Sequence, residues 1–200
     1  MKIYVDFDRT LFDCDKFLED FYALIDKYNI PKALFKECQN QSRRKGFNPY
    51  IILNNLEKKE NFDKKIYQDI DSLIHRTSDY LYPDAIPFLE YLKSMNYEII
   101  ILTKGNSDYQ REKIFNSHLD SYYNKLIVTM KHKGKLDIDY QNGIFIDDNP
   151  IEIQSIMNKN PKKIIRIQRD NSKYGDMTIN IDINCAKSLD EIIQKRLIYI

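Results

Sequence analysis

Two aspartates separated by a single residue stand near the N-terminus, in the run Asp6-Phe7-Asp8-Arg9-Thr10. The residues before them, 1–5, are mostly apolar and predict a short buried strand. In an open α/β sheet, ligands bind outside the carboxyl ends of the strands. Buried carboxylates are unfavourable unless a cation or hydrogen bonds compensate their charge. The aspartate pair therefore predicts a charged site at the end of the first strand.

Other polar residues stand at the ends of later predicted strands. Thr103 follows an apolar run over residues 97–102, and Asp147 and Asp148 follow the run over residues 143–146. In a parallel sheet these strand ends converge on one edge. Several carboxylates together with a hydroxyl and an amine suit magnesium-assisted phosphoryl transfer, because Mg²⁺ prefers carboxylate, water and phosphate oxygens.

The chain before residue 81 predicts helices only, apart from the first strand. Apolar residues recur there at helical spacing, and no strand-like run appears between Cys14 and Tyr80. The predicted helices cover about residues 15–28, begin at Pro31 and at Phe47-Asn48-Pro49, and run over about residues 62–80.

After residue 80 the pattern alternates between strands and helices, which predicts a parallel sheet with helices on both faces. We therefore expect an α/β core made of residues 1–13 and 81–200, with a helical insertion at 14–80. The predicted strands cover residues 97–102, 126–129, 143–146, 164–167 and 178–183, and the predicted helices cover 84–95, 106–116, a segment from Pro150, and 188–196.

These runs together resemble the motifs of the haloacid-dehalogenase (HAD) superfamily of hydrolases. The resemblance covers the whole chain and implies a Rossmann-like HAD core with an inserted, all-helical C1-type cap at residues 14–80. The similar runs are Asp6–Thr10 for the first motif (DxDxT), Ile99–Gly105 for the second, Ile144–Pro150 for the fourth, and Tyr82-Pro83 for the return from cap to core.

The resemblance also implies a role for each matching residue. Asp6 would be the nucleophile, and Asp8 the general acid and then the general base. Thr103 would hydrogen-bond the transferring phosphoryl group. Mg²⁺ would be held by the Asp6 carboxylate, the backbone carbonyl of Asp8 and Asp148, with Asp147 as a further or indirect ligand.

The family's third motif is a lysine, and three lysines are placed to supply it. Lys131, Lys133 and Lys135 all follow the strand predicted at 126–129. Lys133 is preferred, because the run Lys133–Ile138 best resembles the family's lysine-led helix start, and Lys131 is the main competitor. The lysine would neutralise the nucleophile and the phosphate together, so that one anion can attack another.

We therefore expect a Mg²⁺-dependent phosphatase that hydrolyses a small phosphorylated metabolite, a sugar phosphate or a nucleotide, through an aspartyl-phosphate. The alternatives are a phosphomutase of the same superfamily and a non-catalytic binding protein on the same scaffold. Asp8 argues against a dehalogenase, whose family pattern lacks this second aspartate.

Composition restricts the partners and the compartment. Lys plus Arg (31) nearly equals Asp plus Glu (30), so no broad grip on duplex nucleic acid is expected. No apolar stretch approaches the ~20 residues that span a membrane. The three cysteines form no metal-binding or CxxC spacing and predict reduced thiols. With no signal peptide recognised, a cytoplasmic protein with a small-molecule phosphate ester as its partner is expected.

Some polar residues are interpreted without a catalytic role. The basic run Ser42–Gly46 predicts a solvated turn, with a contact to a second charged group of a substrate as the alternative. His75, His118 and His132 are scattered and are interpreted as surface residues. Arg9 departs from the small residue that many family members carry there, and is expected to contact solvent or the helical insertion.

Overall fold

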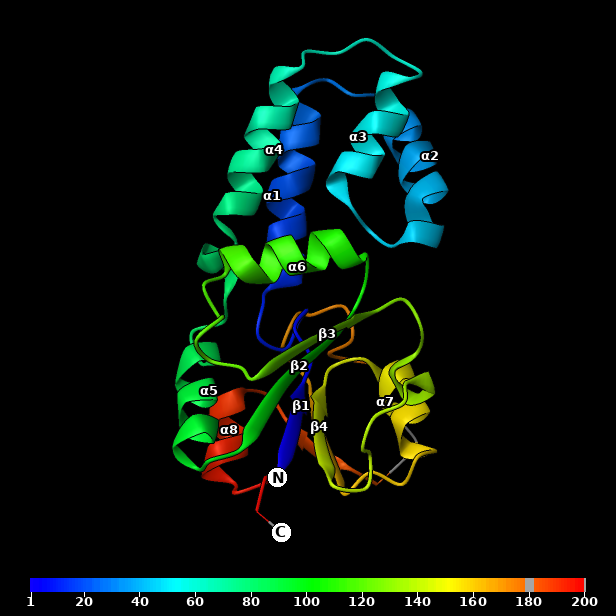
Figure 1. The fold of residues 1–200 in the computed structure, drawn as a ribbon. Coiled ribbons are helices and arrows are strands. Elements are labelled where there is room, and N and C mark those ends of the chain that lie inside the picture. The colour runs from blue at the N-terminus through cyan, green and yellow to red at the C-terminus, as the bar shows by residue number, and fades with distance from the viewer. Residues whose placement is uncertain (179–181, 200) are drawn as a thin grey trace.

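The structure is a computed structural model that describes residues 1–178 and 182–199. A sheet with flanking helices forms the lower half of the molecule in Figure 1, and helices α1 to α4 stand above it. Within the described residues, no helix combines the length and the apolar character needed to cross a membrane.

Within residues 1–178 and 182–199, the sheet has six parallel strands in the order β3-β2-β1-β4-β5-β6. This confirms the predicted Rossmann-like α/β fold. The strand predicted at 178–183 falls partly on residues 179–181, outside the described residues, and the last described strand comes later. The strands are β1 (Lys2–Val5), β2 (Glu98–Lys104), β3 (Lys125–Thr129), β4 (Gly143–Asp147), β5 (Lys163–Ile167) and β6 (Asn184–Ala186).

Helices cover both faces of the sheet, which explains why its central strands are almost wholly apolar. Ile3 and Val5 of β1 belong to the core that includes the buried residues of α5, α6 and α8. Tyr4 points to the other face, where its ring stacks on Phe145 at 4.4 Å beneath α7. The helices of this part are α5 (Ala85–Ser94), α6 (Ser107–Asn116), α7 (Pro150–Met157) and α8 (Leu189–Gln194).

Residues 14–80, all of them described, form helices and turns without a strand. The helix predicted at 62–80 is shorter than expected, because α4 ends at His75 and a 3₁₀ turn follows over Thr77–Tyr80. The Thr77 hydroxyl donates to the carbonyl of Lys113 in α6 at 2.9 Å, which ties this turn to the core. The helices here are α1 (Cys14–Lys27), α2 (Lys32–Ser42), α3 (Pro49–Glu57) and α4 (Lys65–His75).

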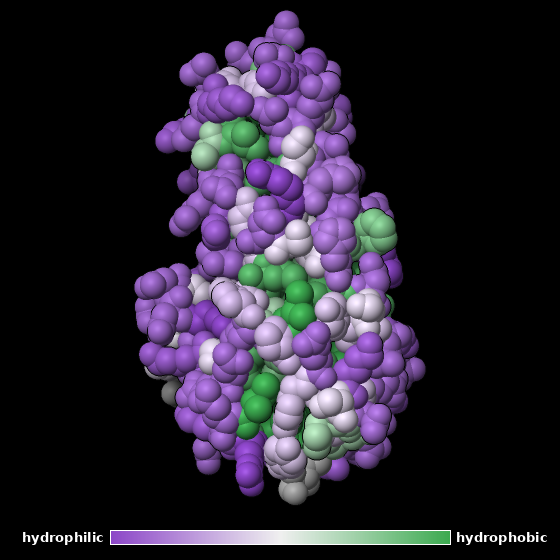
Figure 2. All heavy atoms as spheres, turned by 90° about the vertical axis from the view of Figure 1, so that its left-hand side faces the viewer, coloured by the Kyte–Doolittle hydropathy of each residue, from purple (hydrophilic) through white to green (hydrophobic). Residues whose placement is uncertain are grey.

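Helix α6 lies directly beneath the helical part, as Figure 1 shows. Its N-cap, Asn106, donates to the carbonyl of Lys45 at 2.9 Å and accepts from the amide of Asn48 at 3.1 Å. Gly46 has a φ of 78°, and a Cβ there would stand 2.6 Å from the Asn106 nitrogen. Glycine is therefore required where the two parts touch. On the face turned toward the viewer in Figure 2, the helical part is largely hydrophilic and apolar side chains gather lower down.

A buried ion pair connects the C-terminal region to the segment that follows the first aspartates. Arg169 donates to both carboxylate oxygens of Asp84 at 2.7 Å and to the carbonyl of Thr10 at 2.8 Å. Asp84 also accepts from the backbone nitrogen of Leu189 at 2.8 Å, at the start of α8. The pair therefore joins four separate segments, which contain Thr10, Asp84, Arg169 and Leu189, beside the sheet edge that carries the polar residues.

Replacing Asp84 by alanine leaves the Arg169 charge buried without its carboxylate. We expect Asp84→Ala to lower the free energy of unfolding by about 3–5 kcal/mol, measured by urea denaturation. Asp170→Ala is the matched control, because Asp170 and its partner Lys187 are more than two-thirds exposed (71% and 72%). The control should cost less than about 1 kcal/mol. Equal losses in the two variants would contradict the importance of the buried pair.

Candidate active site

The site lies where the order of the sheet reverses, at the carboxyl ends of the adjacent strands β1 and β4. Asp6 directly follows β1, and its backbone nitrogen donates to the carbonyl of Ile146 at 2.9 Å. Asp147 ends β4 and Asp148 follows it. The sheet register therefore brings together carboxylates that are far apart in the sequence.

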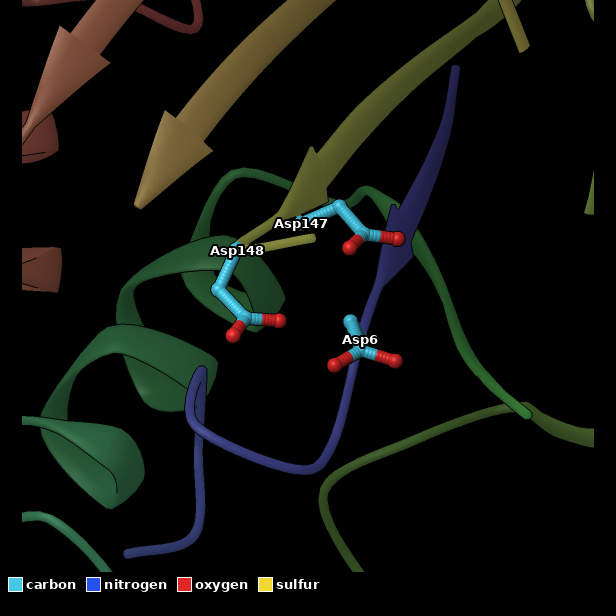
Figure 3. Close-up of side chains that lie close together, drawn as sticks. All are labelled: Asp6, Asp147 and Asp148. Carbon is cyan, nitrogen blue, oxygen red and sulfur yellow. The ribbon is translucent and has the colours of Figure 1, made fainter. Parts of the chain in front are cut away.

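Figure 3 shows Asp6, Asp147 and Asp148 with their carboxylates turned toward one another. One oxygen from each lies within 4.8 Å of the others, and all three side chains are buried. Such a cluster of like charges away from water requires compensating positive charge.

Lys133 supplies part of that charge. Its Nζ donates to Asp6 Oδ1 at 2.5 Å and to Asp147 Oδ2 at 2.6 Å, and its side chain is 2% exposed. The competing lysines, Lys131 and Lys135, are exposed. Of the three lysines left open by the sequence, the structure thus places Lys133 among the carboxylates.

The chain around Lys133 is tightly held. It forms a 3₁₀ turn (Lys133–Lys135) whose first nitrogen donates to Glu152 Oε2 at 2.8 Å. The carbonyl of Lys133 accepts from the Tyr140 hydroxyl at 2.5 Å. A Cβ on Gly134 would stand 1.9 Å from the carbonyl oxygen of Ser155 in α7, so only glycine allows this approach. These contacts aim the ammonium at Asp6.

Burial and charge act together on the titrating groups. Burial, opposed by Lys133 and reinforced by Asp147, raises the pKa of Asp6 to about 7. Burial and the charges of Asp6 and Asp147 raise the pKa of Asp148 well above its ordinary value. Burial alone would lower the pKa of Lys133, but the two carboxylates that it contacts outweigh burial and raise it. One lysine therefore leaves the cluster short of positive charge.

The donor set fits a hard divalent cation. Carboxylate oxygens are the ligands that Mg²⁺ prefers. Asp148 Oδ2 is buried and has no hydrogen-bond partner among the described residues. A cation held by Asp6 and Asp148, with Asp147 beside them, would compensate the charge that Lys133 leaves unbalanced.

Asp8 is held by helix α6. Gln110 Nε2 donates to Asp8 Oδ2 at 2.8 Å and to Thr103 Oγ1 at 2.9 Å, while Lys113 forms an ion pair with Asp8 Oδ1. Burial would raise the pKa of Asp8, but Lys113 and Gln110 outweigh burial and keep that pKa below its usual value. Asp8 and Thr103, both predicted from strand ends, therefore share one partner that the sequence analysis did not select.

Arg9 has a left-handed backbone (φ 60°), and its Nε and Nη2 atoms donate to the carboxylate of Asp15 in α1 at 2.7 to 3.1 Å. Arg9 therefore contacts the helical part, which is one of the two partners expected for it. Asp15 also accepts from the backbone nitrogen of Lys173 at 3.1 Å. These contacts fix the loop after Asp8 against the helices above it.

Other residues near the site were missed because no strand end marks them. Glu152 of α7 accepts from Lys104 at 2.7 Å and lies 2.9 Å from Nδ1 of His132, so His132 has a partner that the sequence did not indicate. The helical period of α7 alone could have flagged Glu152 as a charged residue on a buried face. The basic residues Arg43, Arg44 and Lys45 are exposed.

Two adjoining cavities open at the site. One of about 140 Å³ is lined by Asp6, Thr103, Lys133, Asp147 and Asp148, among others. A second of about 300 Å³ lies between α1 and α6, with Phe17 and Tyr109 in its walls. Asp8, Arg9 and Lys104 line both.

The carboxylate cluster can be tested by cation binding. Asp148→Asn removes a charged ligand, so we expect the Kd for Mg²⁺ to rise by at least about tenfold, measured by calorimetry and by the Mg²⁺-dependent rise in Tm. The exposed Asp137 gives the control variant Asp137→Asn, which should bind Mg²⁺ like the wild type. Unchanged affinity in Asp148→Asn would place the cation elsewhere.

Structures of several hydrolases share this fold. A candidate haloacid dehalogenase-like hydrolase of Burkholderia xenovorans LB400 matches with a TM-score of 0.78 and 17% identity, over 99% of this chain and 98% of that one. A HAD phosphatase of Thermococcus onnurineus matches with a TM-score of 0.71 and 17% identity over 98% of both chains. L-2-haloacid dehalogenase of Xanthobacter autotrophicus matches with a TM-score of 0.64 and 13% identity, over 98% of this chain and 97% of that one.

At these identities the structural likeness shows the fold alone. A search of curated protein sequences found no match. The sequence model of one family, the haloacid dehalogenase-like hydrolases, matches residues 3–166. That match spans β1, the helical segment and the strand ends that carry Asp6, Thr103 and Asp148. The chain belongs to the haloacid dehalogenase-like hydrolase family.

Proposed function

We propose that this hydrolase is a Mg²⁺-dependent phosphatase that cleaves a small phosphate monoester through an aspartyl-phosphate on Asp6. One observation carries the proposal: Lys133 bridges Asp6 and Asp147 beside Asp148, in the pocket that Asp8 and Thr103 also line. The arrangement offers a nucleophile, a proton-transfer group and compensating positive charge around one small volume.

Asp6 is the nucleophile in the first step. A carboxylate oxygen of Asp6 attacks phosphorus, and the bond from phosphorus to the ester oxygen of the leaving group breaks. Lys133 neutralises part of the charge as two anions approach, and Thr103 Oγ1 hydrogen-bonds a phosphoryl oxygen. Mg²⁺ held by Asp6, the backbone carbonyl of Asp8 and Asp148, with Asp147 beside it, would shield further negative charge.

Asp8 carries the protons. In the first step it must be protonated to donate to the leaving oxygen, and so it must first separate from the Lys113 ammonium. In the second step its carboxylate takes a proton from water, which attacks phosphorus and breaks the bond to Asp6. The contacts from Lys113 and Gln110 favour the ionised form, which suits this second role.

The same aspartate separates this proposal from dehalogenation. A dehalogenase has no alkoxide leaving group to protonate, and its family pattern lacks a second aspartate at this place. Here Asp8 is present, and its carboxylate faces the pocket that contains Asp6. The observation favours hydrolysis of a phosphate ester over cleavage of a carbon–halogen bond.

Removal of the nucleophile is the first test. We expect Asp6→Asn to lower phosphate release from para-nitrophenyl phosphate and from a panel of metabolite phosphates by roughly 10⁴-fold or more, because an amide cannot form the acyl phosphate. Release should also stop in EDTA and return with Mg²⁺. Normal turnover by Asp6→Asn would rule out this mechanism, and transfer to a second hydroxyl without net phosphate release would identify a phosphomutase.

The position of the lysine gives a second test with a matched control. We expect Lys133→Met to lower kcat/KM by about 10²–10³-fold, because the charge that stabilises the attacking and accepting groups is lost. Lys131→Met removes an exposed ammonium two residues away and should leave kcat/KM within about twofold. A larger loss in Lys131→Met than in Lys133→Met would reverse the assignment.

A further inference from the structure

The cavity of about 300 Å³ adjoins the proposed phosphate pocket on the side where the leaving group must lie. Asp8, Arg9 and Lys104 line both spaces, so a ligand with its phosphate at Asp6 extends past Asp8 into the larger cavity. Its volume equals that of about ten water molecules. This suits a group of one or two rings.

The walls of this cavity combine charged and polar side chains with a group of aromatic and aliphatic ones. Phe17 and Leu18 come from α1, Phe47 from the loop before α3, and Tyr109 from α6. Phe47 meets Tyr109 edge to face, with ring centroids 5.7 Å apart. A planar ring gains stacking and edge contacts beside these aromatic side chains.

The charges that line the cavity are already paired. Arg9 is paired with Asp15, Lys104 with Glu152, and Lys113 with Asp8. A second anionic group on the ligand would have to displace Asp15 or Glu152, or bind Lys113 in place of Asp8. An uncharged leaving group needs no such displacement.

We propose that this cavity binds an uncharged, planar heteroaromatic ring carried by the leaving group of the substrate, such as the base of a nucleoside monophosphate, in preference to a bare sugar phosphate. The proposal rests on the proposed phosphatase function for its orientation. It narrows the substrate class through the aromatic side chains in the wall and the paired cations.

The first experiment measures binding without catalysis. Uridine, adenosine and ribose are titrated into the full-length protein with Mg²⁺, by calorimetry and saturation-transfer NMR. We expect both nucleosides to bind at least about tenfold more tightly than ribose. Equal or tighter binding of ribose, or no binding of either nucleoside, would overturn the proposal.

A substitution in the cavity wall tests where the nucleoside binds. Leu18→Trp should fill the cavity and lower kcat/KM for uridine 5′-monophosphate more than for glycerol phosphate. Equal losses for both esters in Leu18→Trp would contradict the assignment.

Different results would refute the phosphatase function and the proposed role of the cavity. Nucleoside binding with no phosphate release from any ester would remove the phosphatase function and leave the cavity's preference in place. Phosphate release with ribose 5-phosphate hydrolysed as well as uridine 5′-monophosphate would keep the function and remove this inference.

Discussion

The crowding of three buried carboxylates at the ends of β1 and β4 is the constraint on which the rest of the structure depends. Asp6, Asp147 and Asp148 repel one another away from water, and one lysine cannot balance them. Gly134 and Glu152 hold the 3₁₀ turn of Lys133 against α7. This turn brings the Lys133 ammonium to the three carboxylates. The remaining deficit is the physical reason to expect a divalent metal.

Helix α6 connects this charged centre to the helical segment above it. Its Gln110 and Lys113 hold Asp8, while its N-cap Asn106 contacts the chain around Gly46. The same helix supplies Tyr109 to the wall of the larger cavity. A movement of the helical segment relative to the sheet would therefore change the surroundings of Asp8 and the shape of the leaving-group space together.

Much of the site could be predicted because it sits at strand ends. The apolar runs predict the strands, parallel pairing fixes a common edge, and so Asp6, Asp8, Thr103, Asp147 and Asp148 were expected to meet; their catalytic roles stay predictions. Gln110 and Lys113 could not be selected in this way, because each is one polar residue among several on α6. Their importance depends on which face of the helix the sheet covers.

The sequence by itself determined the parallel α/β architecture, the helical segment after the first strand and the family, because periodicity and motif order are local properties of the chain. Resemblance favoured Lys133 over Lys131 and Lys135, but only the tertiary structure shows that the Lys133 ammonium reaches Asp6 while the other two lysines are exposed. The tertiary structure also decided which aromatic side chains from α1, α6 and the intervening loop share a cavity. Those relations depend on contacts between segments tens of residues apart, which no local pattern encodes.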